Sequence, residues 1–200
     1  GGLGRMFFRV HIGDVIEIHP LLGTFTSLSD FACEENLAQW AGDVAGCAIT
    51  LSLRVDVEAA TLLWDVSAVN QSAKPVRIDT VWVQDIGLAS RGALLSNEAY
   101  TAHYLDESVI QDVTYGPVLS FRQNLQQVGK NPWMMAVCLT GAASYATDAF
   151  DVYGNGYRCG EGASGLEQES LANRCYQYEF SCAALQAKPV DLVAKQSAQF

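Results

Sequence analysis

Residues 64–83 read WDVSAVNQSAKPVRIDTVWV, which is two strand-like runs separated by a polar turn. In the first run, Trp64, Val66 and Ala68 alternate with polar residues, and this is the period of a strand with one buried face. The second run, residues 76–83, starts directly after a turn that ends in proline. Two strands joined by such a turn are typical of antiparallel β-structure.

The same alternation occurs near the start of the chain. Phe8, Val10 and Ile12 share one parity, whereas Arg9 and His11 share the other. This pattern predicts a strand with the three apolar side chains facing inward and the two cationic or polar side chains facing outward.

Alternation is clearest late in the chain. Tyr176, Tyr178, Phe180 and Cys182 have one parity, and polar residues occupy the positions between them. We therefore predict a half-buried strand with an aromatic face over residues 176–182.

Glycine-rich and polar segments separate the predicted strands. Loops are expected at residues 42–46, 129–132 and 154–165, and the last is the longest and the first choice for a functional loop. Residues 93–109 contain helix formers and a candidate cap at Ser96, yet they also alternate, and the pattern favours an extended conformation. Short strands without a βαβ rhythm predict an all-β antiparallel sandwich, organised as a single domain over residues 1–200.

Composition and charge exclude several classes of protein. Half of the residues are hydrophobic, and no apolar run approaches the roughly 18 to 20 residues of a bilayer-spanning helix. A formal net charge of −10 argues against nucleic acid and anionic membrane surfaces as partners. Because the chain begins with Gly1 instead of methionine, we expect it to be a piece of a longer polypeptide.

The cysteines and histidines do not form a recognisable site. Six cysteines have irregular spacings and no Cys-x-x-Cys pair, and the three histidines are scattered along the chain. Buried reduced thiols are the favoured interpretation, and a bridge between Cys159 and Cys175 is the alternative. No metal site is predicted.

Carboxylates are numerous, but no pair of them is singled out as catalytic. The chain lacks the Gly-x-Ser-x-Gly and Gly-x-x-x-x-Gly-Lys-Ser/Thr motifs of hydrolases and nucleotide-binding loops. Among 22 acidic residues, pairs arise by chance, and each carboxylate has a solvated or turn-forming role as its alternative. The candidates for a general acid are Asp85, Glu98, Asp106, Asp148 and Asp151. No catalytic residue is predicted within the chain.

Amide and guanidinium groups lie close to aromatic residues in two stretches of the sequence. Sugars require this mixture, because their hydroxyls need donors and acceptors while their C–H faces pack on rings. The predicted substrate-binding or structural polar cluster comprises Asn97, Glu98, Tyr100, Arg122, Gln123, Asn124 and Trp133. The alternative is an internal ion pair between Arg122 and Glu98, and both roles can hold together.

Ordered motifs in these stretches and elsewhere along the chain carry a family resemblance. They are Gln84–Ala89, Asn97–Tyr100, Tyr104–Asp106, Arg122–Asn124, Tyr145–Phe150 through Tyr153–Gly154, and Tyr176–Phe180 with Ala184–Gln186. Residues 51–192 resemble the N-terminal β-sandwich of cellobiose-phosphorylase-like glycoside phosphorylases, glycoside hydrolase family 94, and most closely that of the 1,2-β-oligoglucan phosphorylases. They are also similar to the phosphorylase-like region of cyclic β-1,2-glucan synthases. Glu107 and Ala149 depart from the synthases, which tend to carry histidine and arginine there.

The resemblance implies a large supersandwich of the galactose-mutarotase type, followed by a helical linker and a catalytic (α/α)6 barrel. The parent enzyme would be an inverting, cytoplasmic phosphorylase that converts β-1,2-glucooligosaccharide and inorganic phosphate to α-glucose 1-phosphate without a cofactor. The implied partners are the barrel of the same polypeptide and the β-glucooligosaccharide, and a homodimer stays open. An autonomous carbohydrate-binding module, a domain of a glucan synthase and a small independent glycosidase are the alternative functions.

Overall fold

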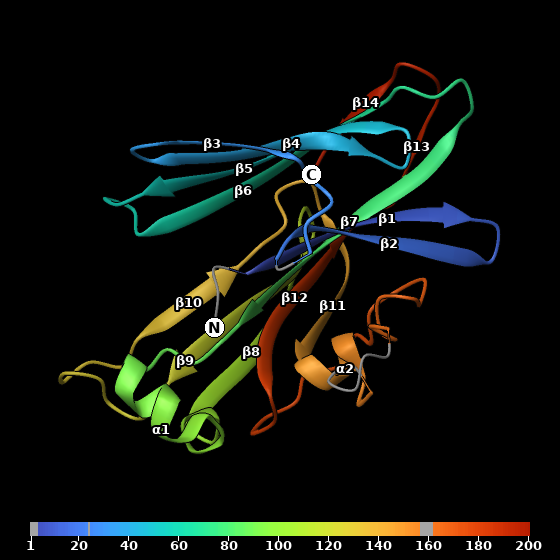
Figure 1. Ribbon diagram of the computed structural model, residues 1–200. Coiled ribbons are helices and arrows are strands. Elements are labelled where there is room, and N and C mark those ends of the chain that lie inside the picture. The colour runs from blue at the N-terminus through green and yellow to red at the C-terminus, as the bar shows by residue number, and fades with distance from the viewer. Residues whose placement is uncertain (1–3, 24, 157–161) are drawn as a thin grey trace. The chain divides into compact units, whose positions relative to one another are not determined.

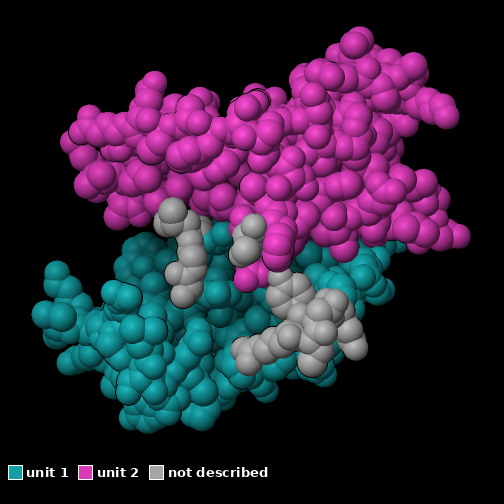
Figure 2. Space-filling view, in the orientation of Figure 1, with its two compact units in different colours: residues 1–4, 81–188 teal, residues 5–80, 189–200 magenta. Residues whose placement is uncertain are grey.

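The computed structural model describes residues 4–23, 25–156 and 162–200, and most of them lie in antiparallel strands. Two compact units share the chain: unit 1 contains residues 1–4 and 81–188, and unit 2 contains residues 5–80 and 189–200 (Figures 1 and 2). The all-β antiparallel sandwich predicted from the sequence is confirmed. No helix among the described residues has the length and apolarity needed to cross a membrane.

Unit 2 is formed by consecutive hairpins. One sheet has the order β14-β6-β5-β4-β3, and β2, β1 and β7 are neighbours in another, with β13 paired to residues 76–78 of β7. The bounds are β1 (Arg5–Ile12), β2 (Val15–Leu22), β3 (Asp30–Glu34), β4 (Leu37–Val44), β5 (Cys47–Asp56), β6 (Thr61–Asn70), β7 (Val76–Asp85), β13 (Val190–Leu192) and β14 (Ser197–Gln199).

The turn between β6 and β7 forms as its sequence predicts. The Asn70 side chain accepts hydrogen bonds from Ser72 and donates to the carbonyl oxygens of Lys74 and Leu192. These hydrogen bonds to the backbone on both sides of the turn hold the turn in one conformation. The loop expected at residues 42–46 is shorter, because β4 continues to Val44.

Strand β1 is buried on both faces instead of one, and Ile12 near its end, which was expected to face inward, is 54% exposed. Arg9 is fully buried instead of facing solvent, and its guanidinium donates two hydrogen bonds of 2.7 Å to Asp79. The ring of His11 lies 2.8 Å from the same carboxylate. The prediction failed because Asp79 on β7 supplies the opposite charge that allows an arginine to be buried.

Unit 1 is a second sandwich, and it carries helices α1 and α2. Its strands form the sheet β10-β9-β8 and the pairing of β11 with β12 and of β12 with residues 81–85 of β7. The bounds are α1 (Arg91–Ala102), β8 (Leu105–Asp112), β9 (Gly116–Gln123), β10 (Trp133–Ala136), β11 (Ala142–Asp148), α2 (Ala149–Tyr153) and β12 (Ser181–Ala187). Leu119, Phe121 and Leu185 belong to one buried cluster to which both sheets contribute.

Two predictions in unit 1 are wrong. Residues 176–180 are not a strand, and β12 begins only at Ser181. Tyr178 has a φ of 70°, which takes the backbone out of the extended region and ends the alternation. The extended conformation expected for residues 93–109 applies only from Leu105, since residues 93–102 belong to α1, which is capped by Ser90 instead of Ser96.

Candidate functional site

Strands β8, β9 and β10 place three polar or aromatic side chains in one cross-strand row. Arg122 on β9 is paired in register with Asp106 on β8 and with Trp133 on β10. All three residues are exposed, and Trp133 retains 66% of its surface. We call Asp106, Arg122 and Trp133 the outer row.

The next row extends the same exposed face. Ser120 is in register with Ser108 and with Met135, which is 50% exposed. The side chains that alternate with these on β9, Leu119 and Phe121, are fully buried in the core. The period of two therefore separates a packed face from a face that combines hydroxyl, charged and flat apolar groups.

Arg122 has no ion pair among the described residues, so the proposed internal pair with Glu98 is not formed. Its guanidinium offers planar donors beside the ring of Trp133 and the carboxylate of Asp106. Such a row suits a neutral polyhydroxylated ligand, whose hydroxyls use the charged groups while a C–H face packs on the indole.

Gln123 lies on the opposite face and has a structural role. It is fully buried, and its Nε2 donates to the carbonyl oxygens of Gly87 and Thr101 at 3.1 Å each. Its Oε1 accepts from the amide of Leu125 at 2.9 Å. With its donors and acceptor satisfied internally, Gln123 is not positioned to bind a ligand.

Asn97 and Glu98 lie on α1, and their hydrogen bonds are to neighbouring residues of the helix and not to the outer row. Asn97 interrupts the helix with a φ of −163°, and its Oδ1 accepts from the Tyr100 amide at 3.0 Å. Glu98 is exposed, and its carbonyl oxygen accepts from the Thr101 hydroxyl. Asn97 therefore starts a second short helical segment in the manner of a cap.

In the aromatic pair that follows, Tyr100 is exposed and Tyr104 is partly exposed. The hydroxyls of Tyr100 and Tyr104 are 3.0 Å apart, and this hydrogen bond raises the pKa of Tyr104 above its ordinary value. The amide of Asn124 donates to the carbonyl oxygen of Tyr104, which ties the end of β9 to this pair. Asn124 is exposed, but it does not belong to the outer row.

Of the seven predicted site residues, the structure brings Arg122 and Trp133 together and distributes the others over α1, the core and the strand end. Their role in binding stays a prediction. Sequence reasoning did not group Asp106 with them, although the register of the β8–β9 hairpin would have identified it. Among the described residues, no group of three or more His, Cys, Asp or Glu could hold a metal ion.

Five cysteines are free thiols: Cys33, Cys47, Cys138, Cys175 and Cys182. Only Cys47 and Cys182 are buried as expected from the sequence, whereas Cys33 and Cys175 are exposed and Cys138 is partly exposed. Cys159, which the alternative paired with Cys175, lies outside the described residues, as does part of the glycine-rich loop at 154–165.

Comparisons with known proteins give a consistent result. The family model described as SOGP N-terminal domain matches residues 1–200. A curated protein of Listeria innocua serovar 6a, named 1,2-beta-oligoglucan phosphorylase, is 33% identical over 93% of this chain, which spans 16% of that protein. Among solved structures, the polysaccharide lyase BACCELL_00875 has a TM-score of 0.57 at 11% identity, over 99% of this chain and 25% of its own. That likeness concerns the fold alone.

Proposed function

The chain belongs to the SOGP N-terminal domain family, and from this membership we infer that it is a non-catalytic β-sandwich domain of a carbohydrate-active enzyme. The proposal rests on the 33% sequence identity with the Listeria phosphorylase, which extends over 93% of this chain. Since the chain spans about a sixth of that relative, the activity of the parent enzyme depends mostly on residues outside it.

The reaction proposed for the parent is inverting phosphorolysis. Inorganic phosphate attacks the anomeric carbon of a terminal β-1,2-linked glucose, and an aspartic acid outside this chain protonates the departing oxygen. The bond between the two glucose units breaks as the bond to phosphate forms, which gives α-glucose 1-phosphate and a glucan one unit shorter. Phosphate is then a co-substrate, and no other cofactor is required.

The partners follow from this assignment. We propose that the sandwich is joined to an (α/α)6 barrel of the same polypeptide. The parent enzyme would act on β-glucooligosaccharide in the cytoplasm. Two apolar residues on the strands of the outer row support such a partner surface: Met135 in the next row and Ile110 two rows away are each 50% exposed.

The test is an assay of the full-length protein with β-1,2-linked glucooligosaccharides. We expect α-glucose 1-phosphate to form only when phosphate is present, with β-1,4-linked cellobiose as the control substrate. Release of free glucose without phosphate would instead identify a glycosidase. Formation of cyclic glucan would favour the alternative of a synthase domain, and an unsaturated sugar product would contradict phosphorolysis.

A second candidate function is an autonomous carbohydrate-binding module, and the outer row is the observation that favours it. Trp133 and Arg122 are adjacent, exposed and free of ion pairing within the described part of the chain. An indole of this exposure offers a stacking surface for the C–H face of a pyranose.

Calorimetry of the chain with β-1,2-glucooligosaccharides tests this second function. Trp133→Ala is expected to weaken binding at least tenfold, about 1.4 kcal/mol. Phe25→Ala serves as the control, because Phe25 is 86% exposed in unit 2 and lies outside the row. No heat of binding at millimolar sugar would remove the module and leave the supporting domain.

A further inference from the structure

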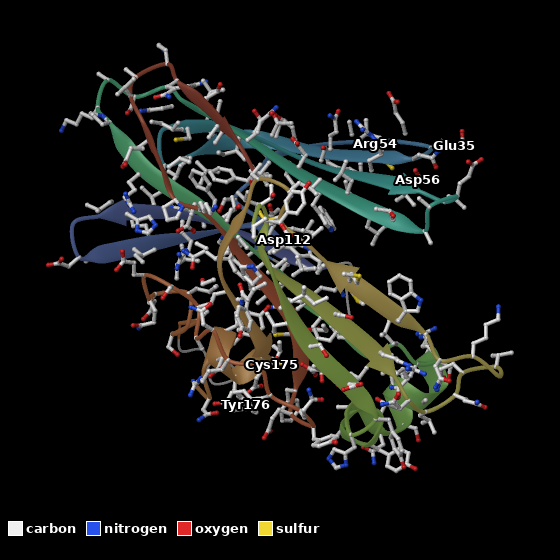
Figure 3. The ribbon with its side chains drawn as sticks, turned by 180° about the vertical axis from the view of Figure 1, so that it is seen from behind. Glu35, Arg54, Asp56, Asp112, Cys175 and Tyr176 are labelled. Atoms are coloured by element: carbon white, nitrogen blue, oxygen red, sulfur yellow. The ribbon has the colours of Figure 1, made fainter. Side chains whose placement is uncertain are left out.

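Residues 173–177, which we call the strap, run beside the edge of β11. The amide of Asn173 donates to the carbonyl oxygen of Tyr145 at 2.9 Å, and Arg174 forms an isolated bridge with Ala146. The amide of Tyr176 donates to the Thr147 hydroxyl at 2.9 Å. Figure 3 labels Cys175 and Tyr176 in this segment.

The other side of the strap is bound to β8 through Glu107. The side-chain amide of Gln177 pairs with the backbone of Glu107: Nε2 donates to its carbonyl oxygen at 2.6 Å, and Oε1 accepts from its amide at 3.1 Å. The thiol of Cys175 also donates to this carbonyl oxygen, at 3.7 Å. The strap thus bridges β8 and β11, and its attachment to β8 depends on the position of Glu107.

The Glu107 side chain occupies an unusual place for a carboxyl group. It is 4% exposed, and its Oε1 accepts from the Ser181 hydroxyl at 2.6 Å. Its Oε2 is shielded from solvent and has no hydrogen-bond partner within the described residues. An ionised carboxylate with an unsolvated oxygen is costly, whereas the protonated form places much less charge in the core.

The groups around Glu107 oppose its ionisation. Burial is the main cause that raises its pKa to about 7, and the Asp148 carboxylate adds to the effect, while the hydroxyls of Ser181 and Thr147 act in the opposite direction. Burial also raises the pKa of the neighbouring thiols of Cys175 and Cys182. These thiols therefore stay neutral and add no negative charge beside Glu107.

The surrounding elements carry mostly acids. Those that act on the cluster of Glu107, Asp148, Cys175 and Cys182 are Asp85 on β7, Asp106 on β8, Asp151 on α2 and Glu179 after the strap. The cation on the strap, Arg174, is already paired with Asp151 at 2.7 Å. Within the described residues, no cation forms an ion pair with Glu107.

We propose that Glu107 is a protonation site that controls the strap. With the proton bound, the carboxyl stays in the core, its backbone holds Gln177 and Cys175, and the strap is closed. Loss of the proton favours a form in which water reaches Oε2 and the strap separates from β8. The device would expose the strap and its Tyr176 ring as the surroundings pass from weakly acidic to alkaline.

The direction of the pH effect follows from the two states. Because the pKa of Glu107 in the closed form is about 7, above the ordinary value of 4.5 for a free side chain, proton binding favours closure. This contribution is fully present below pH 4.5 and is lost as the pH rises through about 7.

Hydrogen exchange of the intact protein, corrected for the intrinsic pH dependence of exchange, tests the proposal at the Tyr176 and Glu107 amides. We expect protection to fall roughly tenfold between pH 6 and pH 8, as the ionised fraction rises. Glu107→Gln should abolish this fall, and Glu179→Gln, which removes an exposed carboxylate beside the strap, should retain it. Equal pH dependence in the wild type and Glu107→Gln would overturn the proposal.

A second variant keeps the test decisive if Glu107→Gln does not fold. Ser181→Ala removes the hydroxyl that stabilises the ionised carboxylate, so the midpoint of the fall in protection should move to higher pH. An unchanged midpoint in a folded Ser181→Ala protein would contradict the role of Glu107.

Discussion

Arg122 and Gln123 are consecutive in sequence but have opposite roles. Both were predicted to belong to one polar cluster, because sequence reasoning saw their hydrogen-bonding groups and not their faces. On β9, alternation exposes the first and buries the second. A strand that is recognised correctly thus divides a polar motif into one candidate ligand contact and one core residue.

Gln123→Ala is expected to destabilise the protein by about 2–3 kcal/mol, because the carbonyl oxygens of Gly87 and Thr101 and the amide of Leu125 lose their partner. Urea unfolding measures the loss. The control, Gln126→Ala, removes the same residue type from an exposed position and should change stability by less than about 0.5 kcal/mol. A neutral Gln123→Ala would remove its structural assignment.

Arg9 shows what a single sequence cannot supply at the residue scale. Its parity placed it on the solvent side, but the Asp79 carboxylate lies 70 positions further along the chain. Two charges can be buried together at moderate cost when they form a bidentate pair, whereas one alone cannot. The pairing depends on tertiary contact between β1 and β7, which periodicity does not contain.

At the scale of elements, strands with a polar turn were predictable and the segment before β12 was not. Tyr176, Tyr178 and Phe180 alternate as a strand would, yet the backbone of Tyr176 bonds to Thr147 and that of Tyr178 turns to positive φ. Alternation reports spacing only. A strand also needs a neighbouring strand to pair with. Residues 176–177 instead belong to the strap, whose hydrogen bonds to β8 and β11 are set by the fold.

The turn between β8 and β9 provides a test at this scale. Gly116 has a φ of 75°, and a Cβ there would lie 2.6 Å from the carbonyl oxygen of Ala142. Gly116→Ala should therefore cost more than about 2 kcal/mol. Gly92→Ala in α1, where a Cβ meets nothing within 4 Å, should instead stabilise by up to about 1 kcal/mol.

Thermal unfolding of both variants gives the comparison. The opposite signs are expected because the two glycines differ in backbone conformation and in the space around them, although the substitution is the same. If Gly92→Ala lost as much stability as Gly116→Ala, the loss could not be attributed to the backbone conformation and the crowding at Gly116.

At the scale of the whole molecule, the fold class and the family were accessible from the sequence, while the internal division was not. Ordered motifs such as Arg122–Asn124 indicated the family, and the alternation of apolar and polar residues indicated the all-β class. The two compact units divide β7 between Thr80 and Val81. The sequence does not mark that point, because the division falls inside one uninterrupted strand.

The proposed division of labour predicts that carboxylates of this chain are not catalytic. Substituting both Glu98→Gln and Asp106→Asn in the full-length protein should leave kcat within about threefold, since loss of a general acid costs roughly 10²–10⁴-fold. Steady-state phosphorolysis measures the effect. A hundredfold loss of kcat with unchanged stability would place a catalytic acid in this chain.

The exposure of Trp133 has a practical consequence for the whole molecule. The other three tryptophans, Trp40, Trp64 and Trp82, are only partly exposed. A soluble quencher such as acrylamide should therefore reach the Trp133 indole first, and the quenched part of the emission spectrum reports on a single strand, β10. The protein thus carries an intrinsic optical probe on the outer row, and occupancy of that face can be followed without attaching a label.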